Sequence, residues 1–194
     1  MNGTEGANAQ TYRLAPTPSS MYSEEQAALV ADYRRSWRSV VEAPDGSLGG
    51  PFDVTLQSPA LARAMMPLAD LVRDGLELPP LRREIVILVV AAVVGCSKVW
   101  GYHHGPAIAA GLSESDAERL RKGDDPTEVE KDDALAARIA RQVASSGRVD
   151  DASYALAAGM FGSRGLVELV ALAGYYRFIA ELINLAQFDA GALA

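Results

Sequence analysis

A nearly unbroken apolar run, IVILVVAAVVG, sets the strongest limit on what this chain can fold into. It has eleven residues, from Ile85 to Gly95, between Glu84 and Cys96. A helix that crosses a bilayer needs about 20 apolar residues, so the run is too short for a membrane span. We therefore expect it to be a core segment that other parts of the chain bury.

The composition of this run suits a buried parallel strand as well as a helix, because Val and Ile are common in both. No other segment of the chain alternates between apolar and polar residues with period two, so a strand here has no partner. The length of the segment, together with Ala91 and Ala92, favours a helix over residues 80–94. Gly95 then allows the chain to break and reverse.

Helix signals recur along the rest of the chain. A Ser N-cap at residue 23, two acidic residues and periodic apolar positions predict a helix over 24–42. Pro and Gly in residues 44–51 end it, and short helices are expected over 59–77. Caps and periodicity predict a helix over 95–111 that ends at Gly111 and another from Ser113 to Gly123. They also predict a helix over Pro126–Gly147, one that begins after Asp150 or Asp151, and one over 164–188. The sequence therefore predicts an all-α fold.

Composition and charge limit the domain count, the compartment and the partners. The chain has 194 residues, which suits one domain, and a formal charge of −7. Nucleic acid and anionic membranes attract clustered Lys and Arg, so we expect neither as a partner. A single cysteine is typical of a reducing compartment, and we expect a cytoplasmic protein. Residues 1–22 lack the features of a signal peptide and are predicted to form a disordered or extended tail, leaving one domain over 23–194.

The only cysteine and both histidines of the chain lie within ten residues, in GCSKVWGYHH. On a helix Cys96, Trp100 and His103 share one face, whereas His104 points about 100° away. Such crowding of reactive side chains in one segment favours a chemical explanation.

A reversal at Gly95 brings a carboxylate to this segment. Glu84 then lies about 16 Å back along the preceding helix and His103 about 12 Å along the next, so the two side chains can meet. A carboxylate that is hydrogen-bonded to one imidazole nitrogen fixes the tautomer, and the other nitrogen is available for acid–base chemistry.

Each of these residues also has a structural explanation. A Glu near the start of a helix interacts favourably with the helix dipole. Trp100 lies one turn before His104, so a ring contact accounts for that histidine. A lone cysteine such as Cys96 is most often a small buried apolar residue.

The cationic and aromatic residues nearby leave similar alternatives open. We expect Lys98, Arg82 and Arg83 to lie in solvent, although one of the arginines can hold a substrate carboxylate with its paired donors. Residues 175–177, Tyr-Tyr-Arg, are expected mainly to pack, and the lining of a pocket is the lesser alternative. The chain has no GxSxG, CxxC or HExxH motif and no phosphate-binding loop, so no metal and no cofactor is predicted.

Residues 81–123 resemble the carboxymuconolactone decarboxylase superfamily, which also contains the alkylhydroperoxidase D-like proteins. The resemblance rests on Arg-Glu before an apolar helix, a W-x-x-H segment, then A-x-x-A-G-L-S and a short acidic helix. A looser resemblance extends over about 25–190. It implies an all-α subunit whose central antiparallel helical hairpin builds the active site, assembled as a homotrimer or a larger homo-oligomer such as a hexamer.

The peroxidase branch of this superfamily has a Glu twelve residues before the first cysteine of C-x-x-C, and a His four residues after the second. The matching positions here are Glu84, Cys96, Val99 and His103. Because Val99 replaces the second cysteine, peroxide reduction through an internal disulfide cannot run. A one-cysteine route through Cys96 requires an external thiol, and a thiol-dependent peroxidase remains the alternative function.

The decarboxylase branch uses no cofactor, and its lactone substrate loses carbon dioxide to leave an enolate. The resemblance implies that His103 protonates this enolate, that Glu84 orients His103 and that Trp100 lines the pocket. We further predict that Arg83 or Lys98 neutralises the substrate carboxylate or the enolate oxygen. His104 is included among the residues expected to bind the substrate.

We therefore expect a cofactor-free acid–base enzyme for a small carboxylated or enolisable molecule. Decarboxylation is the leading reaction. A related isomerisation or cyclisation, which includes a step in a secondary-metabolite pathway, would use the same residues. A non-catalytic binding protein on the same fold is the third hypothesis. The apolar residues around helix 164–188 predict that the protein is not a monomer.

Overall fold

The computed structural model describes residues 12–36 and 42–186. Apart from one isolated antiparallel bridge, the regular secondary structure of these residues is helical. The prediction of an all-α chain is confirmed. A 3-10 turn η1 (Ser19–Met21) and a π-helical turn η2 (Leu71–Gly75) accompany the α-helices. The α-helices are α1 (Glu24–Ser36), α2 (Pro51–Leu56), α3 (Pro59–Asp70), α4 (Pro80–Val94), α5 (Ser97–Ala109), α6 (Glu114–Lys122), α7 (Lys131–Ser146) and α8 (Asp151–Ala186).

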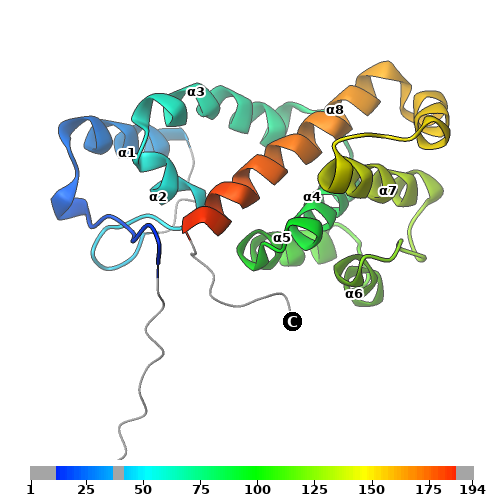
Figure 1. Cartoon of the computed structure of the whole chain (residues 1–194), viewed down its shortest axis with the longest axis horizontal. Coiled ribbons are helices and arrows are strands. Elements are labelled where there is room, and N and C mark those ends of the chain that lie inside the picture. The colour runs from blue at the N-terminus through cyan, green and yellow to red at the C-terminus, as the bar shows by residue number, and fades with distance from the viewer. Residues whose placement is uncertain (1–11, 37–41, 187–194) are drawn as a thin grey trace, which may run out of the picture.

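Helix α4 lies at the centre of the main core. Every residue from Ile85 to Ala91 is at most 1% exposed, because α5, α7 and α8 pack around this helix (Figure 1). Each fully buried Val, Leu or Ile contributes about 1.5–3 kcal/mol to folding, so this segment is a major source of stability. Among the described residues, no helix has both the length and the apolar character needed to cross a membrane.

A second, smaller core holds α1, α2 and α3 together beside one end of α8 (Figure 1). Tyr33 of α1 is buried there, and its hydroxyl lies 2.8 Å from the Thr55 hydroxyl of α2. The ring of Phe52 meets the Tyr33 ring edge-on at 5.2 Å. The two cores meet at α8, whose last described residue, Ala186, accepts a hydrogen bond from the backbone N–H of Arg13.

Most predicted helix ends agree with the structure. The helix over 80–94 is confirmed, and Gly95 ends it with a φ of 69°, a left-handed conformation that suits glycine. Ser113 caps α6 by accepting a hydrogen bond from the Asp116 N–H, and Gly123 follows the helix. The Asp150 carboxylate accepts from the Ser153 N–H at the start of α8.

Some of the helix predictions differ from the structure. The helix 24–42 is described only to Ser36, with residues 37–41 outside the described part of the chain, and Glu42 forms an isolated bridge with Leu48. Residues 51–56 form a helix that was not predicted. The helix predicted over 164–188 is present as the second part of α8, separated from the first part by Gly162, which has a φ of 66° and a ψ of 177°, and residues 187–188 lie outside the description.

The helix predicted from Pro126 begins only at Lys131. The buried carboxylate of Asp116 accepts hydrogen bonds from the backbone N–H groups of Thr127 and Glu128, both at 2.7 Å. These contacts with α6 hold the segment in a loop, although its proline and acidic residues are also typical of a helix start.

The predicted tail lies only partly within the described residues, because residues 1–11 are outside them. Residues 12–22 contact the domain through the Thr17 N–H, which donates to both carboxylate oxygens of Asp53 at 3.1 and 3.2 Å. The boundary between tail and domain at residue 22 stays a prediction.

Asp53 is expected to make stability depend on pH. Its carboxyl group is 2% exposed, and burial raises its pKa from 3.8 to about 6, an effect that the Asp45 charge increases and the Thr17 hydrogen bond opposes. Since the folded protein holds this proton more tightly than the unfolded chain, its contribution to stability is full below about pH 4 and is lost as pH rises through 6. Asp53→Asn should raise the free energy of unfolding at pH 7.5 by about 1–3 kcal/mol.

Urea unfolding of wild type and Asp53→Asn at several pH values measures this effect, and the difference between them should shrink towards pH 4. Asp150→Asn is the matched control. The exposed Asp150 carboxylate accepts a hydrogen bond from the Ser153 N–H, which lowers its pKa, so its loss should not stabilise the protein at pH 7.5. An Asp53→Asn variant less stable than wild type at that pH would contradict the expectation.

Candidate functional site

Glu84 and His103 form the centre of the candidate site. The turn at Gly95 reverses the chain, and the Cys96 N–H donates to the carbonyl oxygen of Ala91 at 2.9 Å, so α5 returns along α4. His103 Nδ1 lies 2.8 Å from Glu84 Oε2. The side chains are 15% and 10% exposed, respectively, so this hydrogen bond is largely shielded from water but remains reachable.

This hydrogen bond sets which nitrogen of His103 is available for chemistry. A carboxylate only accepts, so Nδ1 carries the proton that it donates to Glu84. Within residues 12–36 and 42–186, Nε2 makes no hydrogen bond. His103 is therefore held in one orientation by Glu84 while its second nitrogen can exchange a proton with a bound molecule.

The two adjacent arginines have different surroundings. Arg83 Nε lies 3.7 Å from Glu84 Oε1, and its Nη1 donates to the carbonyl oxygen of Arg73 in η2 at 2.6 Å. Arg82 lies on another side of α4, where its guanidinium pairs with Asp132 and Asp133. Only Arg83 is part of the site.

The expectation that Arg82 lies in solvent is wrong, because its side chain is 11% exposed. Its Nε lies 2.8 Å from Asp133 Oδ1, and its guanidinium carbon is 4.9 Å from the centre of the Phe161 ring. Arg82 thus links α4 to α7 and α8. Lys98 is exposed on α5, and at 100° per residue it lies about 140° around the helix from His103.

His104 and Trp100 form a separate pair on α5. Their rings stack with centres 6.2 Å apart and an angle of 28° between the planes. His104 Nε2 lies 3.1 Å from Glu114 Oε2 of α6, so this histidine is directed towards α6 and not towards Glu84. Trp100 is 9% exposed, so little of its surface is available for contact with a ligand.

Cys96 is fully buried at the N-cap of α5, and the neighbouring Val99 is 4% exposed. A reactive thiol needs access to its oxidant and an environment that favours the thiolate. Cys96 therefore has the surroundings of a packed apolar residue, although it shares the face of α5 that carries His103.

Two tyrosines complete the surroundings of His103. The ring of Tyr176 of α8 stands at 90° to the imidazole with centres 5.0 Å apart, and the ring of Tyr102 meets it at 62° and 5.5 Å. Burial, followed by the negative charge of Glu84, raises the pKa of Tyr176. From the sequence, Tyr176 was expected mainly to pack, with the lining of a pocket as the lesser alternative.

The hydrogen-bonded pair of Glu84 and His103, from α4 and α5, thus lies beside the Tyr176 ring of α8. Comparison with known proteins identifies the segment that carries this pair. The model of the carboxymuconolactone decarboxylase family matches residues 59–129. The resemblance predicted from the sequence is thereby confirmed. No curated protein matches the chain.

The segment that matches the family model extends from α3 to the loop before α7. It includes Glu84 and His103 but neither α8 nor Tyr176, so one wall of the site comes from outside the matched residues. Over the described parts of the chain, no group of three or more His, Cys, Asp or Glu side chains is arranged to hold a metal ion.

Proposed function

We propose that the protein is a cofactor-free acid–base enzyme that acts on a small carboxylated or enolisable molecule, with decarboxylation as the leading reaction. The observation that carries this proposal is the 2.8 Å hydrogen bond between His103 Nδ1 and Glu84 Oε2, which leaves Nε2 without a partner among the described residues. The match of residues 59–129 to the carboxymuconolactone decarboxylase family supports the same chemistry.

The proposed reaction needs one proton donor. The bond between the substrate carbon and its carboxylate breaks, carbon dioxide leaves, and the electron pair moves through the conjugated system onto the carbonyl oxygen to give an enolate. His103, protonated on both nitrogens, transfers the Nε2 proton to the enolate carbon and regains a proton from water. The Glu84 carboxylate stabilises the imidazolium through Nδ1 and holds it in place.

A carboxylated substrate also needs a local cation, because the chain as a whole carries a formal charge of −7. Arg83 is the better candidate of the two predicted cations, since its guanidinium is 26% exposed and borders Glu84. Lys98 faces another side of α5. We propose that Arg83 pairs with the substrate carboxylate. The stacked rings of Trp100 and His104 on α5 are proposed to limit the space available to the substrate.

Turnover of carboxymuconolactone tests this function directly. We expect carbon dioxide release, and in heavy water the product should carry deuterium at the carbon that His103 protonates. Binding without release of carbon dioxide would favour a non-catalytic binding protein. Substrates for isomerisation or cyclisation through an enolate should be compared in the same assay.

The burial of Cys96 leads to a prediction that separates the peroxidase alternative. Cys96→Ser should keep turnover within about threefold of wild type, because proton transfer from His103 uses no thiol. Cys96→Ala serves as a second variant in case the buried hydroxyl lowers stability. Loss of organic hydroperoxide in the presence of an added thiol is measured in parallel. A peroxidase rate that wild type shows and both variants lack would favour the alternative.

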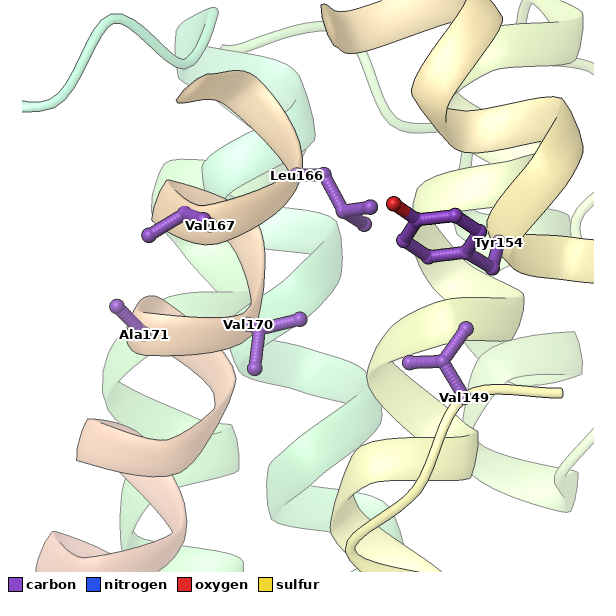
Figure 2. A pocket seen from close by; sticks show the side chains of 6 residues that line it. All are labelled: Val149, Tyr154, Leu166, Val167, Val170 and Ala171. Carbon is purple, nitrogen blue, oxygen red and sulfur yellow. The ribbon is translucent and has the colours of Figure 1, made fainter. Parts of the chain in front are cut away.

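We also propose that the protein assembles as a homotrimer or a hexamer. Val167, Phe178 and Leu185 of α8 are 66%, 37% and 52% exposed, and their spacings of 11 and 7 residues put them on one face of the helix. An apolar groove begins on this face. In Figure 2 the Leu166 and Val170 side chains are directed towards the Tyr154 ring, whereas those of Val167 and Ala171 point away from it. The groove is lined by Val149, Tyr154, Leu166, Val167, Val170 and Ala171.

An exposed apolar groove with further exposed apolar side chains along the same helix is typical of contacts between subunits. Light scattering should give a mass of about 62 kDa or more, three times the 20.6 kDa of one chain. Val167→Asp, on the face of α8 opposite Tyr176, should shift the population towards smaller species. A mass of about 20 kDa for wild type at micromolar concentration would rule out this assembly.

A further inference from the structure

The adjacent tyrosines of α8 face different parts of the molecule. Their rings lie 5.5 Å apart at 85°, as expected for neighbours that diverge by about 100° on a helix. The phenol of Tyr175 lies within range of the charges of Asp70 and Arg73, at the end of α3 and in η2. The phenol of Tyr176 instead lies within range of Glu84 and Arg83.

Tyr176 therefore faces the candidate site. Its ring stands perpendicular to the His103 imidazole at 5.0 Å, so α4, α5 and α8 each bring one side chain to the same place. Across residues 12–36 and 42–186 the Tyr176 hydroxyl makes no hydrogen bond. Tyr176 is partly buried, and its hydroxyl is not among the buried polar atoms that lack a partner, so the hydroxyl is accessible and a molecule bound beside His103 can accept a hydrogen bond from it.

The protonation of Tyr176 suits a donor. Burial and the Glu84 charge both disfavour the phenolate and raise the pKa of Tyr176, so the hydroxyl keeps its proton at neutral pH. Arg83, by contrast, is held by Glu84 and by the Arg73 carbonyl oxygen. A neutral hydroxyl without a competing acceptor is the group best able to form a new hydrogen bond when negative charge develops on a substrate oxygen.

We propose that the Tyr176 hydroxyl donates a hydrogen bond to the oxyanion that forms on the substrate while His103 protonates the neighbouring carbon. This inference takes its location from the proposed function and deepens it. It narrows the substrate class to molecules whose reacting carbon is conjugated to a carbonyl oxygen, such as an unsaturated lactone or a β-keto acid. A carboxylate whose loss leaves no enolate would make no use of Tyr176.

Binding of 4-nitrophenolate, a planar oxyanion whose absorption shifts when it accepts a hydrogen bond, tests the donor without any turnover. Wild type should bind it with a shift of the absorption maximum. Because the chain has only two histidines, imidazole NMR signals can show that the probe lies beside His103. Tyr176→Phe keeps the ring and removes the hydroxyl, so it should weaken binding by about tenfold or more and abolish the absorption shift.

Tyr175→Phe is the matched control, and its affinity for the probe should stay within about twofold of wild type. Thermal unfolding shows that each variant is folded. Equal binding by wild type and Tyr176→Phe, or no binding by wild type at millimolar probe, would overturn the proposal.

Turnover of carboxymuconolactone separates this inference from the function on which it rests. A wild type that binds the probe through Tyr176 but releases no carbon dioxide would refute the decarboxylation of carboxymuconolactone and leave Tyr176 as a hydrogen-bond donor to a bound oxyanion. A Tyr176→Phe variant with undiminished kcat and KM for carboxymuconolactone would refute the inference alone.

Discussion

Replacement of His103 by alanine should lower turnover by about a hundredfold to ten-thousandfold, the usual range for loss of a general acid. The expectation rests on Nε2 of His103, which has no partner in the described part of the chain, and on the 2.8 Å hydrogen bond that Nδ1 makes with Glu84. KM should change much less than kcat, because the imidazole acts mainly in the proton-transfer step.

Two further variants make this experiment specific. Glu84→Gln should cost less, about tenfold, since a glutamine oxygen still accepts from Nδ1 but no longer carries the charge that stabilises the imidazolium. His104→Ala should be mild, because His104 is stacked on Trp100 and paired with Glu114 of α6. Circular dichroism shows whether each variant is folded. If a folded His103→Ala protein kept most of its activity, or if His104→Ala lost more activity than His103→Ala, His103 would not be the proton donor.

Replacement of Arg82 by methionine should lower the free energy of unfolding by about 3 kcal/mol or more. Arg82 and Asp133 are 11% and 10% exposed, so removal of the cation leaves a buried carboxylate with no charged partner on α4. The change also removes the contact of the guanidinium with the Phe161 ring. For a chain of this size the loss corresponds to a decrease in Tm of about 6–12 °C.

Arg138→Met is the matched control for this measurement. Arg138 pairs with Asp125 at 3.2 Å, but its side chain is 50% exposed, and pairs of this kind contribute about 0–1 kcal/mol. Thermal and urea unfolding should therefore separate the two variants clearly. Arg82→Met and Arg138→Met proteins of equal stability would show that the buried pair between α4 and α7 contributes little.

Local signals in the sequence determined most of the helices. The helix 80–94, the turn at Gly95 and the caps at Ser113 and Gly123 were all predicted correctly. Each depends on a few neighbouring residues, such as a glycine that adopts positive φ or a serine that accepts from an N–H three residues later. The meeting of Glu84 with His103 followed from the same information, because one reversal and a fixed rise per residue set their positions.

Contacts between distant segments decided what the sequence could not. Asp116 of α6 holds residues 127–128 in a loop where a helix was predicted, and no local pattern around Pro126 reveals a partner so far away in the chain. Arg82 and Arg83 are chemically identical neighbours. Only the packing of α7 against one side of α4 determines that Arg82 is buried in an ion pair and that Arg83 borders the site.

The same distinction holds for the candidate site. The sequence by itself determined an all-α chain and the pair of Glu84 and His103, since backbone propensity and helix geometry act over short distances. Only the tertiary structure decided that Cys96 is buried and that Tyr176, more than seventy residues after His103, forms a wall of the site. The physical reason is that burial and ring contacts depend on which faces of α4, α5 and α8 pack together, and this choice minimises exposed apolar surface over the whole chain.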